Sequence, residues 1–149
     1  MSKVKRLRSV LELLKCKEKN AAIKLGQCLQ KQQSMLNNLN NLHQFHDEYS
    51  QRLTQKSSLG MDARQLHQYR LFLAQIDNAI LKQQASLAQA ERDAALHQQK
   101  WHSSLQHKKG VEQVLQTTEA FVFQRQMQRE QLENDERAGR GKKKFYGEA

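Results

Sequence analysis

The sequence has no proline and only six glycines among its 149 residues. Proline breaks helices because its ring clashes with the preceding turn and its nitrogen carries no hydrogen, so little in this chain interrupts a helix. Aromatic residues make up 6% and hydrophobic residues 38% of the chain, and the hydrophobic share is below the roughly 45–50% of soluble globular domains. A thick multilayered core is therefore not expected. The residues that dominate, Ala, Leu, Gln, Glu, Lys and Arg, favour helices.

Long apolar runs are also missing. No segment approaches the roughly 18 consecutive apolar residues of a membrane span, and the basic start of the chain is not followed by the apolar core of a signal peptide. The two cysteines, Cys16 and Cys28, fall in one predicted helix. About 18 Å separates them along its axis, whereas a disulfide needs Cα atoms within about 7 Å. We therefore expect no intrachain disulfide and a cytoplasmic location, where thiols stay reduced.

The net charge of +10 is carried by the two termini. Residues 1–24 hold eight cations against Glu12 and Glu18, and residues 137–149 hold five cations against Glu148. Residues 25–136 hold twelve cations and twelve anions. The shaft is thus neutral, and a hairpin would bring both basic segments to one end, which suits nucleic acid or an acidic partner.

One clear interruption divides the chain. Gly60 suits a helix C-terminus or a tight turn, and Asp62 or Ser58 suits the N-cap of the following helix. A second break is expected around residues 138–141, followed by a lysine-rich tail. The prediction is a single all-α domain over 1–137, with a helix over about 3–57, a turn over about 58–61, a helix over about 62–137, and a flexible basic tail over 138–149.

Heptad periodicity supports two long coiled-coil helices. In the first, every seventh residue from Leu7 to Tyr49 is apolar or nearly so, and five of eight companion positions are apolar. Glu18, Gln32 and His46 are the polar companions. The second helix has eight apolar residues among nine such positions, but only half of its companion positions are apolar. We call these positions the seam, and they predict that the helices pack against each other.

A short connection favours antiparallel neighbours. Folding at Gly60 pairs residues whose numbers add up to roughly 122, which brings Leu42 to Ile80 and the small Ala21 to the large Trp101. A slip by one heptad is an open alternative. In this register the second helix extends beyond the first by about twenty residues.

No motif for catalysis is present. The sequence lacks a phosphate-binding glycine loop, a CxxC pair and a nucleophile elbow, and a two-helix rod has no concave pocket. His43 and His46 share a helix face, but no third metal ligand is evident. We predict a protein that is not an enzyme and that holds no metal or cofactor.

Apolar residues beside the seam are candidates for binding. Phe72 and Ala79, with Ile76 at the edge of the seam and with Gln83, form one stripe of the second helix that a two-helix hairpin leaves open. The alternative is that Phe72 folds over the seam and shields it. A second group, Phe121 to Phe123, falls where the first helix offers no partner in this register. Either another protein covers it, or the register of the two helices differs from the predicted one.

One segment of the second helix and several other positions carry a family pattern: Tyr69 to Ile80, then Ala90-Glu91, Trp101, Leu7, the Leu11/Leu14 pair and the charged tail. In these features the chain resembles the flagellar export protein FliJ family, with injectisome YscO-type stalk proteins as distant relatives. The resemblance covers essentially the whole chain. It implies an antiparallel two-helix coiled coil, similar to the central stalk of rotary ATP synthases, that serves type III protein export in flagellum biogenesis and hence motility.

The resemblance also implies partners. These are the hexameric flagellar export ATPase, the export gate protein FlhA and export chaperones, reached at the inner membrane at the flagellar base. The gate contact carries over to Phe72, Ile76, Ala79 and Gln83. The ATPase contact falls on the end with both termini, as a region: Lys3, Lys5, Arg6, Arg8, Phe121 and Phe123.

Two other readings stay open at the level of sequence. One is a general cytoplasmic coiled-coil chaperone or scaffold. The other is a basic nucleic-acid-binding coiled coil, although a basic zipper needs parallel dimers, which a hairpin does not form. We expect no nucleic-acid partner.

Overall fold

The computed structural model describes the backbone of residues 2–147 and the surroundings of the side chains of residues 2–141. It contains two α-helices, α1 (Lys3–Ser58) and α2 (Ala63–Gly147). The chain divides into two compact units, each formed by a stretch of both helices. Unit 1 comprises residues 1–18 and 104–149, and unit 2 comprises residues 19–103. The predicted all-α coiled-coil hairpin is confirmed.

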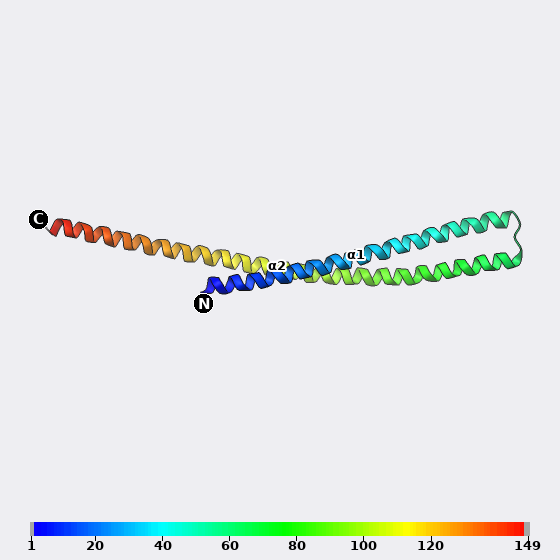
Figure 1. The fold of residues 1–149 in the computed structure, drawn as a ribbon, viewed down its shortest axis with the longest axis horizontal. Helices are drawn as coiled ribbons and strands as arrows, with labels where there is room; N and C mark the ends of the chain where they lie inside the picture. Colours follow the sequence, from blue (N-terminus) through cyan, green and yellow to red (C-terminus); the bar gives the residue numbers. More distant parts are fainter. Residues whose placement is uncertain (1, 148–149) are drawn as a thin grey trace. The chain divides into compact units, whose positions relative to one another are not determined.

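The turn between the helices lies in unit 2 (Figure 1). Gly60 has a φ of 91°, a left-handed conformation that glycine adopts without the clash of a side chain. The Oδ1 atom of Asp62 accepts a hydrogen bond of 2.8 Å from the backbone N–H of Gln65, so Asp62 is the N-cap of α2. Gly60 and Asp62 therefore have the roles predicted from the sequence, and the turn lies one residue later than expected.

In unit 2, α1 and α2 run antiparallel and side by side (Figure 1). The core of this unit is a cluster of Leu39, Ile76 and Ile80, against which three further seam residues pack: Leu42, Tyr49 and Leu87. The Nε2 atom of Gln83 donates a hydrogen bond of 3.0 Å to the backbone oxygen of Met35. The contacts agree with the predicted register, since the numbers of Gln83 and Met35 add up to 118 and those of Lys56 and Tyr69 to 125.

Unit 1 is held by the same seam. Leu11, Leu14 and Leu115 are buried, and Glu18 and Lys108 form a half-buried ion pair of 3.9 Å between the two helices. Arg8 and Glu119 form a second, exposed pair of 2.9 Å. Both pairs have residue numbers that add up to 126 or 127, a register only slightly offset from the predicted one.

The second helix extends far beyond the start of the first. Every residue from 120 to 141 is exposed. From about residue 124 onward α2 has no partner helix, because α1 begins at Lys3, opposite that residue in this register. The structure also continues α2 to Gly147, ten residues beyond the predicted end. Gly139 and Gly141 do not end the helix, because a glycine inside a helix costs only about 1 kcal/mol and leaves the backbone hydrogen bonds intact.

The two basic segments of unit 1 consequently do not meet. Residue 137 lies about 20 Å further along α2 than the position opposite Lys3, at 1.5 Å per residue. The expectation of one basic end is therefore corrected to a basic α1 start beside residues 118–124 of α2 and a separate basic segment near the end of α2.

Candidate partner-binding surfaces

The predicted stripe after the turn is only partly open. Phe72 is 40% exposed, but Ile76 is 8% exposed and belongs to the core cluster of unit 2. Ala79 is half-buried, and Gln83 is half-buried with its amide engaged by Met35. The sequence placed Ile76 at the edge of the seam, whereas the structure places it within the seam. The open part of this stripe is therefore Phe72.

Phe72 does not stand alone. Its ring lies 4.5 Å from that of Tyr49, measured between centroids, at an interplanar angle of 52°. Gln68 and Tyr69 line a shallow hollow with these two rings, and the Lys56 ammonium lies 5.2 Å from the centre of the Tyr69 ring. Phe72 thus covers the seam and also offers an aromatic surface to solvent, which combines the two readings that the sequence left open.

Tyr49 is the residue of this surface that sequence reasoning did not assign. The heptad pattern places Tyr49 in the seam, and its side chain is half-buried, as expected of a seam residue. Its contact with Phe72 follows from the antiparallel register, because their numbers add up to 121. A heptad diagram of both helices in the predicted register places Tyr49 next to Phe72, so the sequence contained the information needed to predict this contact.

In unit 1 the predicted region has two chemically different parts. Lys3, Lys5 and Arg6 are exposed cations at the start of α1, whereas the guanidinium of Arg8 is held by the Glu119 carboxylate. Phe121 and Phe123 are 58% and 65% exposed on α2. The structure therefore brings exposed cations and exposed aromatic rings into the same unit.

The exposed apolar surface continues along α2. Val122 and Met127 are each 49% exposed, and Leu132 is 61% exposed. The Arg125 guanidinium carbon lies 5.7 Å from the centre of the Phe121 ring. Single exposed apolar residues are normal on protein surfaces, whereas adjacent exposed apolar residues such as Phe121 to Phe123 are typical of a surface that another molecule covers.

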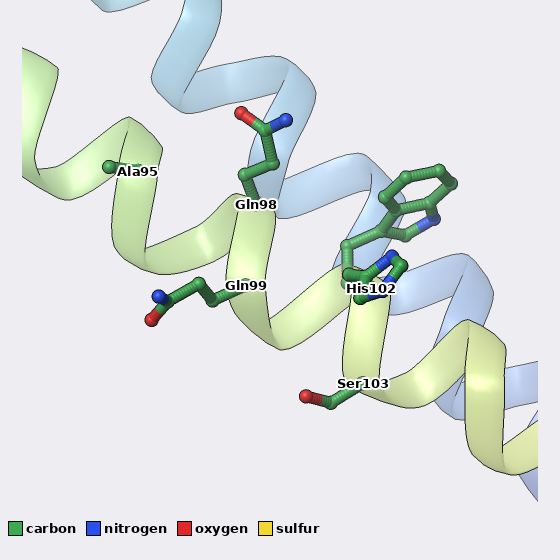
Figure 2. A pocket seen from close by; sticks show the side chains of 6 residues that line it. Ala95, Gln98, Gln99, His102 and Ser103 are labelled. Atoms are coloured by element: carbon green, nitrogen blue, oxygen red, sulfur yellow. The ribbon is translucent and has the colours of Figure 1, made fainter.

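The described residues offer little for catalysis or metal binding. The Nε2 atom of His46 lies 3.0 Å from Oδ1 of Asp77 across the two helices, and no group of three His, Cys, Asp or Glu side chains suited to a metal occurs among them. A surface hollow along α2 is lined by Ala95, Gln98, Gln99, Trp101, His102 and Ser103 (Figure 2). The side chains labelled in Figure 2 all come from one helix, and the lining residues include no carboxylate and no cysteine.

Comparison with known protein families decides the assignment. The family described as flagellar FliJ protein matches residues 2–143, nearly the whole chain. The chain belongs to the FliJ family. FliJ proteins are non-catalytic components of flagellar protein export, so this chain has a role in flagellar protein export and flagellum biogenesis.

Two other comparisons add nothing to the FliJ assignment. A search of curated proteins and a search of solved structures found no match. Within the described residues, neither FliJ helix has an apolar stretch long enough to cross a membrane.

Proposed function

We propose that the chain is a stalk or adaptor of the flagellar type III export apparatus. It links the export ATPase hexamer to the export gate protein FlhA and assists the delivery of chaperones and their substrates. The supporting observation is that two chemically different exposed surfaces lie in different units. An aromatic surface containing Phe72 lies in unit 2, and a surface of cations and phenylalanines lies in unit 1.

The gate contact is proposed for Phe72 and its neighbour Tyr49. Aromatic side chains with a half-exposed ring are frequent energetic centres of protein interfaces. Ile76, Ala79 and Gln83 offer less surface to a partner, because they are buried or half-buried. Ile76 acts mainly by holding the two helices together.

The gate contact is tested with Phe72→Ala and the cytoplasmic part of FlhA in a titration calorimeter. The matched control is Leu71→Ala, since Leu71 is the adjacent residue of α2 and is 53% exposed. We expect Phe72→Ala to weaken binding by at least about tenfold, the equivalent of about 1.4 kcal/mol, and Leu71→Ala to leave it within about twofold. Equal affinities for the two variants would exclude this surface as the gate contact.

The ATPase contact is proposed for the exposed cations Lys3, Lys5 and Arg6 with Phe121 and Phe123. Exposed charges steer association and lose strength as salt screens them, with a Debye length of about 10 Å at 0.1 M and about 3 Å at 1 M. Arg8 contributes less, because Glu119 already neutralises its guanidinium.

The ATPase contact is tested with the double variant Lys3→Glu/Lys5→Glu. Its control, Lys31→Glu/Lys82→Glu, changes the total charge equally through two exposed lysines of unit 2. We expect the first variant to lose ring binding and its salt dependence, and the second to retain both. Ring binding that is independent of salt in the unmodified chain would contradict the electrostatic part of the proposal.

A further inference from the structure

The two flanks of the seam in unit 1 differ in chemistry. In an antiparallel pair, residues at heptad position e of both helices share one flank, and residues at position g share the other. With Leu11 and Leu115 as a positions, Arg8 and Glu119 are both e positions. Their contact therefore identifies the e flank. The opposite flank carries the g positions, which include Val10 of α1 and Val114 of α2.

The g flank is apolar at its centre and remains exposed. Val10 is 44% exposed and Val114 is 47% exposed. Leu13, at the c position of α1 that lies next to this flank, is 58% exposed. Val10 and Leu13 are three residues apart and therefore lie on one face of α1. Val114 lies across from Val10 on α2, since their numbers add up to 124. We call these three residues the flank patch.

Charge is segregated between the two flanks. The paired part of unit 1 contains four carboxylates, Glu12, Glu18, Glu112 and Glu119, and none of them occupies a position beside the flank patch. Glu18 and Glu119 bind cations across the seam or on the e flank, and Glu12 binds Lys15 3.4 Å away.

The charged side chains nearest to the patch are cationic. Arg6 and Lys17 continue the row of Val10 and Leu13 at either end, because the four residues are spaced by four, three and four positions along α1. Among the described residues, neither Arg6 nor Lys17 forms an ion pair with a carboxylate. The patch is thus an apolar row with an unneutralised cation at each end.

We propose that the flank patch binds an acidic amphipathic helix of a partner protein. A third helix can pack along the flank of two paired helices. Its apolar side chains insert between the side chains of Val10, Leu13 and Val114. Carboxylates flanking the apolar stripe of this third helix form ion pairs with Arg6 and Lys17. The patch shares Arg6 with the proposed ATPase contact, but its other residues lie outside that contact, and its test uses neither the ATPase nor FlhA.

The probe is a synthetic fluorescein-labelled peptide of about three heptads, with leucine at positions a and d and glutamate at e and g. Its control has the same composition in an order without the heptad repeat. Binding to the full chain is followed by fluorescence anisotropy. We expect the repeating peptide to bind at least about tenfold more tightly than the scrambled one. Equal affinities would show that the net charge alone attracts the peptide and would overturn the proposal.

Variants then locate the site. Val10→Ser/Leu13→Ser is expected to weaken binding of the repeating peptide about tenfold or more. The control Ile23→Ser/Leu29→Ser removes comparably exposed apolar residues of α1 in unit 2 and is expected to leave the affinity unchanged. Lys17→Glu is expected to weaken binding more than Lys19→Glu, although both change the net charge equally. Loss of binding in both serine variants, or equal effects of the two lysine variants, would contradict the assignment.

A competing occupant is a second copy of the chain. Sedimentation equilibrium distinguishes it, because a patch covered by a second copy would double the mass of the unmodified chain but not that of Val10→Ser/Leu13→Ser. A monomeric chain that binds the repeating peptide supports the proposal. A dimer that dissociates on this substitution would overturn it. Circular dichroism of each variant confirms that the helices are retained.

Discussion

Replacing Ile76 with alanine tests whether this residue belongs to the core or to a docking surface. Its side chain is 8% exposed and packs with Leu39 and Ile80, while Leu42, Tyr49 and Leu87 pack around the cluster. Ile→Ala substitutions in cores cost roughly 2–5 kcal/mol. A seam of two helices is open to solvent at its sides, so water fills part of the space and the lower part of this range applies. We expect a loss of about 2–3 kcal/mol.

The assay is urea unfolding monitored by far-UV circular dichroism, with hydrogen exchange to localise the effect. Two units need not unfold in one step, so exchange of the backbone amides of unit 2 reports the change directly. The control is Leu81→Ala on the same helix, where the side chain is 64% exposed and the expected cost is below about 0.5 kcal/mol. Equal losses for Ile76→Ala and Leu81→Ala would refute the assignment of Ile76 to the core. A selective loss of FlhA binding by Ile76→Ala at unchanged stability would do the same.

Further substitutions at Gly60, Asp62 and the Glu18–Lys108 pair test the turn and the seam. Gly60→Ala should cost about 1–2 kcal/mol of unfolding free energy from the left-handed backbone alone, because no heavy atom lies within 4 Å of the added carbon; a neutral effect would contradict this. Asp62→Ala should cost about 1 kcal/mol through the lost N-cap bond, and Asp62→Asn much less, both measured by urea unfolding. Lys108→Leu should destabilise unit 1 because it removes the cation beside half-buried Glu18, whereas Glu18→Leu/Lys108→Leu should recover stability; additive losses would argue against coupling.

The sequence predicted the seam well because heptad periodicity is a property of the chain itself. All fifteen seam positions of α1, from Val4 to Leu53, are buried or half-buried. The turn could also be predicted from the sequence, since a glycine with a positive φ and an aspartate N-cap are local features. The antiparallel register followed from the turn and from the short connection between two patterned helices.

The features that sequence reasoning missed depend on the partner helix. Ile76 was assigned to the edge of the seam because one helix alone does not show how far the opposite helix covers it. Phe72 packs on Tyr49, a contact between residues 23 positions apart in the sequence. The end of α2 was predicted ten residues too early, since glycine weakens a helix without determining where it stops.

The central claim is that one chain joins the export ATPase to the gate through two separate surfaces. A direct measurement is capture of the ATPase hexamer on immobilised cytoplasmic FlhA, with and without the chain. We predict that the ATPase is captured only when the chain is present, and that capture is lost with Phe72→Ala and, independently, with Lys3→Glu/Lys5→Glu. Competition between the ATPase and FlhA for the chain, so that each displaces the other, would contradict the account.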